Sequence, residues 1–306
     1  MCSLFSRPAL SQANRAKTCL TYKGAYYGTV NLAFNKYDEN TATHEKHAPL
    51  VVMHGLFGHK QNWNSVAKAL NRRLRITVFT VDLRNHGDSP WTRTMTYSDM
   101  AADVALFIRE VVPKEIGARH EVKVHLLGHS MGGKTAIKVA LSQDNNELLK
   151  SLIIEDIAPK KYETKNHLEF PKFLRAMKKA DLSKSRHEIN HALEPVIKDF
   201  AIRQFLLTNL VGTSGNLRWR LNMEVVEKYV PHVCEVEECV GQYSGPTIFI
   251  SGQNSPYVQA ADHSLILKHF PRAKFSVIDG SGHWVHAEKP YEFMAEVEKF
   301  ISNVVN

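Results

Sequence analysis

The chain has 306 residues, of which 43% are hydrophobic and 23% charged, a balance typical of a globular protein. Its length suits one catalytic domain with an insertion, and its longest apolar runs, such as Leu50–Val52, are far shorter than the ~20 residues of a membrane-spanning helix. The formal net charge of +8 favours anionic partners, but zinc-finger, basic-zipper and RNA-binding patterns are absent from the sequence, so we expect no nucleic-acid partner.

The N-terminal stretch contains no acidic residue before Asp38, and it carries Arg7, Arg15 and several lysines and serines. An acid-free start with Arg and Ser is typical of a mitochondrial transit peptide. We therefore expect residues 1–23 to be a leader and the protein to be mitochondrial. A disordered tail on a cytoplasmic protein is the alternative.

Strand and helix candidates alternate along most of the remaining chain. The strand candidates are short apolar runs, at 25–34, 50–53, 76–82, 122–127, 152–156, 247–251 and 274–278. The helix candidates have a helical apolar repeat, at 63–70, 99–112, 134–141 and 290–301, and Ser98 is the expected N-cap of the second. This alternation predicts the α/β class, with a mostly parallel sheet flanked by helices.

Residues 159–243 interrupt the alternation, because this stretch has helical periodicity and offers no strand candidate. Within it, Phe170, Phe173, Leu174 and Met177 share one helical face, and basic residues lie elsewhere on the same helix. We predict a core formed by residues 24–158 and 245–306, with a helical cap at 159–244 inserted between its two parts.

The sequence Gly-His-Ser-Met-Gly at 128–132 has the G-x-S-x-G pattern. The pattern alone is weak, but a buried strand candidate leads into it and a helix candidate leads out of it. This is the setting of a nucleophile elbow, in which a tight turn holds a serine hydroxyl above the sheet edge. We predict Ser130 as the nucleophile. An ordinary glycine-rich turn is one alternative, and the match of 128–135 to the phosphate-binding pattern G-x-x-x-x-G-K-T is another.

A serine hydroxyl needs a base to act as a nucleophile, and His283 is the candidate. It lies in Gly-Ser-Gly-His-Trp, after the last strand candidate, where the chain order of this fold places the histidine. His286, three residues later, is the rival.

A catalytic triad also needs an acid that stabilises the charged histidine, and its position is less obvious. Asn254 occupies the usual place after the fifth strand, and a neutral amide cannot stabilise an imidazolium. Asp156 closes the preceding strand, so its side chain should reach the same crevice, whereas Glu155 should face the opposite side. We predict Asp156 as the acid, with Asp262 as the second choice. A capping role for Asp156 is the structural alternative.

The oxyanion of the transition state needs backbone N–H donors. We expect them from Met131, directly after the nucleophile, and from Leu56 in the glycine-containing sequence His-Gly-Leu-Phe-Gly at 54–58. The H-E-x-x-H metal motif is absent from the sequence, so we expect neither a metal nor a cofactor.

From Leu50 to its end, the chain resembles the esterase group of the α/β-hydrolases in the ordered motifs HGLFG, DLRNHGDS, GHSMGGK, EDIAP, GQNSPYV and GHWVHAEKP. The resemblance implies an eight-stranded sheet with a helical cap, and ester hydrolysis with Ser130 and His283 at the family's catalytic positions. It matches Asp156 to the acid of the bacterial members, although some descriptions place an acid inside the cap, where Glu224 corresponds. The animal members are regarded as mitochondrial lipases acting on diacylglycerol.

We therefore predict a serine hydrolase that cleaves lipid or acylglycerol esters through an acyl-enzyme on Ser130. The substrate is a small-molecule or lipid ester, and the apolar cap face with its basic flank suits a peripheral contact with an anionic membrane. Packing of that face onto the core is the alternative. A hydrolase of carbon–carbon bonds or thioesters would keep the same triad, and a binding module would carry it as a vestige. The oligomeric state stays open.

Overall fold

A computed structural model describes residues 28–41, 47–162, 169–234 and 239–305. The expected leader at 1–23 lies outside the described residues. Among the helices of the described part, none has both the length and the apolar character that crossing a bilayer requires.

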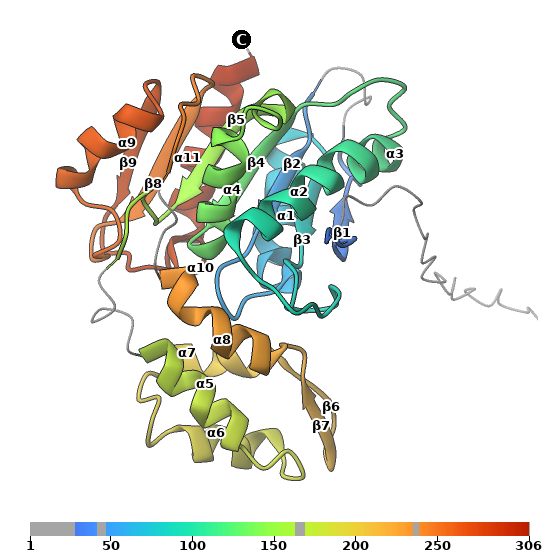
Figure 1. The fold of residues 1–306 in the computed structure, drawn as a ribbon, viewed down its shortest axis with the longest axis vertical. Coiled ribbons are helices and arrows are strands. Elements are labelled where there is room, and N and C mark those ends of the chain that lie inside the picture. The colour runs from blue at the N-terminus through green and yellow to red at the C-terminus, as the bar shows by residue number, and fades with distance from the viewer. Residues whose placement is uncertain (1–27, 42–46, 163–168, 235–238, 306) are drawn as a thin grey trace, which may run out of the picture.

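A seven-stranded sheet forms the centre of the molecule, in the order β1-β3-β2-β4-β5-β8-β9 (Figure 1). The strands are β1 (Phe34–Tyr37), β2 (Leu50–Met53), β3 (Val78–Val81), β4 (Val124–His129), β5 (Leu149–Glu155), β8 (Thr247–Gly252) and β9 (Ala273–Ile278). β1 runs antiparallel to β3 at one edge, and the other pairs are parallel. This confirms the predicted mostly parallel sheet.

The described residues give the sheet seven strands, whereas the resemblance implied eight, and the first strand begins later than predicted. Of the predicted strand at 25–34, residues 25–27 lie outside the described part, and β1 starts only at Phe34. The N–H of Val30 donates to the Asp103 carboxylate at 2.8 Å, and the N–H of Ala33 donates to Ser89 Oγ at 2.8 Å. Side chains thus take the donors that an earlier strand would have offered to a neighbour.

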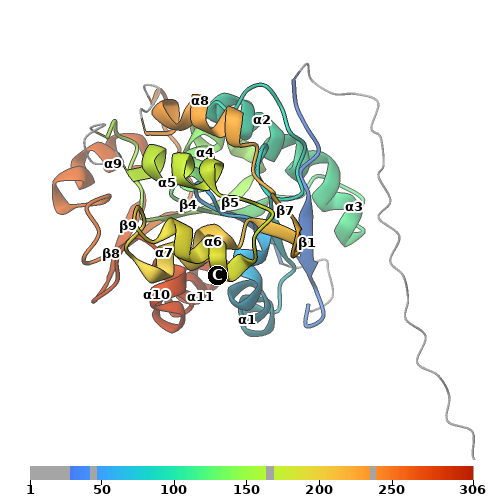
Figure 2. The same ribbon diagram turned by 90° about the horizontal axis from the view of Figure 1, so that it is seen from below.

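Helices cover both faces of the sheet (Figure 2). One face carries α1 (Asn64–Leu74), α10 (Val285–Glu288) and α11 (Pro290–Val305), and the other carries α2 (Tyr97–Leu106), α4 (Met131–Leu141) and α9 (His263–His269). A π-helical turn (Phe107–Val111) and α3 (Val112–Ile116) follow α2, and a 3₁₀ turn (Lys60–Trp63) precedes α1. Because both faces are covered, β2, β3 and β4 are wholly buried, and most of their side chains are apolar.

The N-cap of α2 is Thr96, so the expectation of Ser98 was wrong. The Thr96 hydroxyl accepts from the N–H of Asp99 at 3.0 Å, and the Asp99 carboxylate accepts from the N–H of Thr96 at 3.1 Å. This reciprocal capping box satisfies two backbone donors at once and therefore fixes the helix start two residues earlier.

The segment between β5 and β8 lies at the carboxyl ends of the strands, below the sheet in Figure 1. It contains α5 (Glu169–Lys179), α6 (Arg186–Leu193), α7 (Phe200–Leu207) and α8 (Met223–Cys234), together with a hairpin of β6 (Leu210–Thr213) and β7 (Asn216–Trp219). On α5, Phe173, Leu174 and Met177 are buried and Phe170 is half-buried, which confirms the predicted apolar face. We keep as a proposal the division into a core of 24–158 and 245–306 and a cap of 159–244.

The hairpin contradicts the expectation that this segment holds no strand. A two-residue turn at Ser214 and Gly215 joins β6 to β7, and Gly215 has a φ of 83°, which a residue without Cβ adopts readily. Leu217 and Trp219 alternate with exposed residues, and the Trp219 indole donates to the carbonyl of Met177 at 3.1 Å. The Ser-Gly dipeptide was the turn signal that periodicity alone passes over.

Buried histidines make the fold sensitive to acid. Burial is the largest cause that lowers the pKa of a set of histidines from 6.5 to about 3 or 4, and the set consists of His54, His59, His86, His125, His129 and His286. Between these values and 6.5 the unfolded chain binds protons that the folded chain does not. Each histidine therefore lowers the free energy of unfolding by up to about 1.4 kcal/mol for each pH unit below 6.5.

We expect the melting temperature, measured calorimetrically, to fall steeply from about pH 7 to about pH 5. Glu155 works in the opposite direction, because burial raises its pKa from 4.5 to about 7 and the folded state then holds that proton more tightly. Glu155 is a single group, so its effect on stability is smaller than the combined effect of the buried histidines. A melting temperature that stays constant over this range would contradict the neutral burial of these histidines.

Candidate active site

The loop between β4 and α4 is a single residue, Ser130, whose backbone has a φ of 52°. A non-glycine residue in this region is strained, and such strain is typical of a nucleophile elbow. The N–H of Ser130 donates to the carbonyl of Glu155 at 3.0 Å, which fixes the turn to the end of β5. Ser130 is half-buried and lines a pocket at this edge of the sheet.

The glycines around Ser130 are required by close packing. A Cβ on Gly128 would lie 2.2 Å from the carbonyl oxygen of Gly132, and a Cβ on Gly132 would lie 2.6 Å from the carbonyl oxygen of His54. No side chain fits at either distance, so the strand, the helix and the loop after β2 approach one another only because both positions lack a side chain. The same geometry makes the phosphate-loop interpretation wrong, because α4 begins at Met131 and leaves no open loop to surround a phosphate.

Asp156 and His283 lie in direct contact. His283 Nδ1 is 2.6 Å from Asp156 Oδ2, across 127 residues of sequence. Asp156 is fully buried, and it also accepts from the N–H of Gly252 at 3.1 Å and from the hydroxyl of Ser255. Because each carboxylate oxygen has a donor, the buried charge is compensated. Tyr257 stacks on the His283 ring at a centroid distance of 4.1 Å.

The other acids considered from the sequence lie elsewhere. Asp262 forms an ion pair with Lys160 at 2.6 Å, and Glu224 is exposed in the first turn of α8. Asn254 is exposed, and its backbone N–H donates to the carbonyl of Ser281 at 2.8 Å. Asp156 is thus the candidate acid whose contact with His283 the structure shows, and we propose it as the acid of the triad.

His286, the rival base, faces away from the pocket. Its Nδ1 lies 2.7 Å from Glu155 Oε1, on the opposite side of β5 from Asp156. With His129 these two residues form a buried group whose possible ligand atoms lie within 4.8 Å of one another, the kind of group that could hold a metal ion.

The loop after β2 lies against the nucleophile. A Cβ on Gly55 would be 3.3 Å from the Cβ of Ser130, and Leu56 and Met131 both line the pocket beside Ser130. His54 fixes this loop, because its Nδ1–H donates to the carbonyl of Gly55 at 2.8 Å while its Nε2 accepts from the N–H of Leu83 at 3.0 Å. This arrangement supports our proposal that the N–H groups of Leu56 and Met131 form the oxyanion hole.

Sequence reasoning missed several residues that support the site. Ser255 and Tyr257 contact Asp156 and His283, and Asn209 donates from the cap to the carbonyl of Phe57 at 2.7 Å. The loop after β8 already carried the polar pattern Gly-Gln-Asn-Ser, which could have indicated Ser255. No local signal indicates Asn209, because its partner is 152 residues away.

A small pocket, partly open to solvent, lies at Ser130. Its walls are mostly apolar or aromatic, and the lining residues are Leu56, Tyr97, Ser130, Met131, Lys134, Ile157, Tyr162, Phe170, Val233 and Tyr257. Phe170 and Val233 belong to the segment between β5 and β8, so the pocket lies where this segment meets the sheet. Such a lining suits an apolar acyl chain.

We expect Asp156→Asn to lower the turnover number by about 10⁴, because an amide favours the wrong tautomer of the histidine and cannot stabilise the imidazolium. Steady-state hydrolysis of a chromogenic ester measures it. Asp262→Asn and Glu224→Gln serve as matched controls and should stay within a few-fold of the unmodified protein. Full turnover in Asp156→Asn would exclude Asp156 as the acid.

Comparisons with known proteins agree with this geometry. The family model described as alpha/beta hydrolase fold matches residues 48–290. The sn-1-specific diacylglycerol lipase ABHD11 of Xenopus tropicalis is 37% identical over 283 residues, which cover 90% of this chain and 83% of the relative. Esterase YbfF of Escherichia coli is 32% identical over 256 residues, covering 84% of this chain and 94% of the relative.

A solved structure of a marine microorganism esterase is similar throughout, with a TM-score of 0.78 and 34% identity, and the match covers 89% of this chain and 100% of that chain. These matches confirm the resemblance to animal and bacterial esterases that the motifs indicated. The chain therefore belongs to the α/β-hydrolase family, as an enzyme of the carboxylic ester hydrolase type.

Proposed function

We propose that this enzyme hydrolyses lipid esters, with acylglycerols as the substrate class, through an acyl-enzyme on Ser130. The observation that carries the proposal is the buried hydrogen bond of 2.6 Å between Asp156 and His283. Tyr257 stacks on the His283 ring and lines the same pocket as Ser130. Acyl transfer by a serine requires a strained nucleophile and a base oriented by a buried carboxylate, and Ser130 and His283 supply these two parts.

In the first step, His283 Nε2 takes the proton of Ser130 as Oγ attacks the ester carbonyl carbon. Nδ1 holds its proton toward Asp156, which leaves Nε2 as the basic nitrogen. The imidazolium then gives the proton to the departing alcohol, and the acyl group stays on Ser130. Water attacks the acyl-enzyme by the same route, with His283 as base, and releases the carboxylic acid.

The negative charge that develops on the carbonyl oxygen is stabilised by the N–H groups of Leu56 and Met131. Each such donor is worth about 10²–10³ in turnover, because it is already oriented when the charge appears. The loop that carries Leu56 is held from both sides, by His54 from β2 and by Asn209 from the cap. A fixed loop keeps the donor directed at the oxyanion.

The acylglycerol assignment is supported by the aromatic and aliphatic pocket, and by relatives that are named as sn-1-specific diacylglycerol lipases. An acylglycerol suits this pocket because its apolar acyl chain can lie against Phe170 and Val233. The same triad serves thioester and carbon–carbon bond hydrolases, which are the competing outcomes of the substrate test.

We expect a fluorophosphonate to label the unmodified enzyme at Ser130, and Ser130→Ala to abolish both labelling and hydrolysis, because the attacking oxygen is removed. A panel of monoesters and diacylglycerols of increasing acyl length then measures kcat/KM. We expect kcat/KM to rise with acyl length as more of the chain is buried in the pocket. A thioester of the best acyl chain is the matched control substrate. Absence of an adduct, or a strong preference for the thioester, would contradict the proposal.

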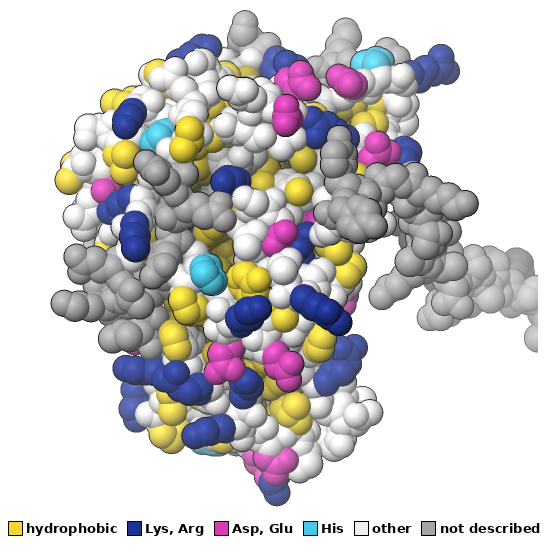
Figure 3. Space-filling view, in the orientation of Figure 1, with side chains coloured by type: hydrophobic (Ala, Val, Ile, Leu, Met, Phe, Trp, Pro, Cys, Tyr) yellow, Lys and Arg dark blue, Asp and Glu magenta, His cyan; other side chains and the backbone are white. Residues whose placement is uncertain are grey.

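The charged surface of the cap supports a peripheral contact with an anionic membrane. Lys and Arg side chains gather over the cap in the lower part of Figure 3, and Lys172, Arg175 and Lys179 are exposed on α5. Phe173, Leu174 and Met177 of the same helix are buried, so charge rather than insertion of α5 attracts the membrane. The mitochondrial location stays a prediction from residues 1–23.

We expect the enzyme to sediment with vesicles that contain anionic lipid and to be released by high salt, because the attraction is electrostatic and is screened. The triple change Lys172→Glu, Arg175→Glu and Lys179→Glu should abolish sedimentation, while hydrolysis of a short soluble ester is retained. Equal binding to neutral vesicles would contradict the electrostatic contact.

A further inference from the structure

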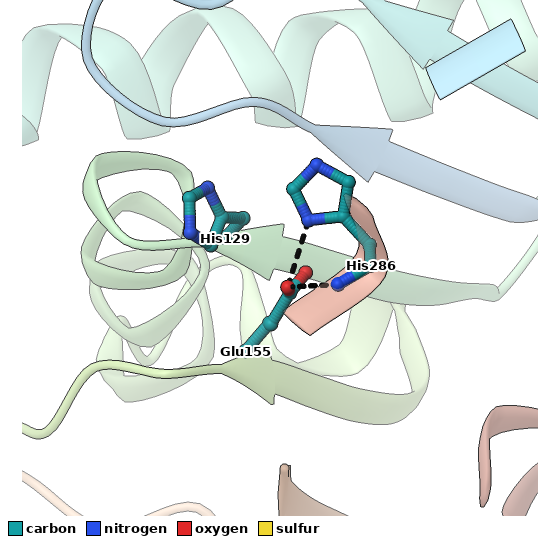
Figure 4. A group of neighbouring side chains, drawn as sticks. All are labelled: His129, Glu155 and His286. Atoms are coloured by element: carbon teal, nitrogen blue, oxygen red, sulfur yellow. Dashed lines mark hydrogen bonds and ion pairs between the residues drawn. The ribbon is translucent and has the colours of Figure 1, made fainter. Parts of the chain in front are cut away.

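A second polar cluster, formed by His129, Glu155 and His286, lies behind the proposed triad. Each member is close in sequence to a triad residue, since His129 precedes Ser130, Glu155 precedes Asp156, and His286 follows His283 by three residues. All members are buried. Figure 4 shows Glu155 reaching from β5 toward the backbone and ring of His286, with the His129 ring beside them.

Glu155 holds His286 in place through both its backbone and its ring. Glu155 Oε1 accepts from the N–H of His286 at 2.9 Å and lies 2.7 Å from its Nδ1. Trp63 also fixes the His286 ring, because it stacks on that ring at a centroid distance of 4.0 Å and an interplanar angle of 16°. The chain that follows His283 is thus attached through His286 to β5 and to the 3₁₀ turn before α1.

His129 holds the His283 residue itself. Its Nε2 lies 3.0 Å from the carbonyl oxygen of His283. A carbonyl can only accept, so Nε2 carries the proton and donates. Burial lowers the pKa of His129 to about 3, which keeps the ring neutral, and the ring packs so close to Gly55 that a Cβ there would lie 2.8 Å from its Nδ1.

We propose that His129, Glu155 and His286 form a positioning network that fixes the backbone of His283, so that its ring stays on Asp156 and directed at Ser130. The inference rests on the proposed function and names residues that act through His283 without contacting the substrate. The ends of β4 and β5 therefore supply residues to both groups. Ser130 and Asp156 belong to the proposed triad, and His129 and Glu155 belong to the positioning network.

A metal site is the competing explanation for the same side chains, because their possible ligand atoms lie within 4.8 Å of one another. The contacts favour the hydrogen-bond network. Glu155 Oε1 and His286 Nδ1 already bond to each other, and His129 Nε2 bonds to a carbonyl. A cation would have to displace these bonds, and with them the attachment of the His283 loop.

Glu155 also carries an electrostatic role in the network. Burial raises the pKa of its carboxyl group to about 7, and electrostatic interactions with His129, Asp156 and His283 also act on it. Its Oε2 has no hydrogen-bond partner among the described residues. Because that pKa lies near neutral pH, the charge of Glu155 and its hydrogen bonds to His286 are separable contributions.

The test compares His129→Leu with His125→Leu in the full chain. His125 is a matched control on the same strand, buried and bonded to Ser151 at 2.7 Å, far from the His283 loop. We expect His129→Leu to lower kcat, and the rate of fluorophosphonate labelling of Ser130, by up to about 100-fold with little change in KM, the cost of a misplaced catalytic group. His125→Leu should lose stability and keep its kcat below its melting temperature.

Two conservative variants separate positioning from a merely structural effect. His129→Gln can still donate to the His283 carbonyl and should recover most of the lost kcat. Glu155→Gln keeps the acceptor for His286 and removes the charge, so it should retain most of the kcat if the hydrogen bonds do the positioning. The low-field proton resonance of the His283–Asp156 hydrogen bond should broaden in His129→Leu, and this readout does not depend on ester hydrolysis.

Equal losses of kcat in His129→Leu and His125→Leu, or no recovery in His129→Gln, would overturn the positioning network. Stoichiometric metal in the purified enzyme, lost together with activity on chelation and absent from Glu155→Gln, would replace it with a metal site. If the unmodified enzyme is not labelled at all, the proposed function fails, and the proton resonance alone then decides the network.

Discussion

The hydrogen bond between Asp156 and His283 is the constraint on which the functional edge of the sheet depends. It joins the end of β5 to the loop after β9, and a fully buried carboxylate is tolerated there only because its oxygens also accept from Gly252 and Ser255. The loops after β5, β8 and β9 are therefore mutually dependent. Displacing the loop after β8 or the loop after β9 removes at least one donor from this buried charge.

The same edge stores backbone strain at two neighbouring strand ends. Ser130 and Asp156 have φ values of 52° and 48°, and the N–H of Ser130 donates to the carbonyl of Glu155. Positive φ values at both positions turn the chain sharply, which places the serine and the acid at the edge of the sheet. The strain is sustained by packing that glycines permit at 128 and 132, and by hydrogen bonds from adjacent strands.

Most of the sheet was predictable from sequence because its strands are short apolar runs bounded by turn residues, and Asp156 was selected by the presence of Asn254 where an acid is usual. The hairpin β6–β7 was missed because helical periodicity masked a Ser-Gly turn, and Thr96 because a reciprocal capping box outweighed a nearer serine. The contacts of Glu155 and Asn209 span 131 and 152 residues, so no local pattern encodes them. Local spacing identifies which residues can react, whereas long-range packing decides what holds them.

The proposed cap contacts both the pocket and the loop after β2 that we propose as the oxyanion loop. Phe170 and Val233 line the pocket, Phe170 packs edge-on against Phe57 at 6.0 Å, and Asn209 donates to the carbonyl of Phe57 in the oxyanion loop. A change in this segment is therefore expected to alter both the loop that carries the proposed Leu56 donor and the wall of the pocket. Under the function that we propose, selectivity for the acyl chain would then be expressed in turnover as well as in binding, because remote binding energy contributes to the chemical step.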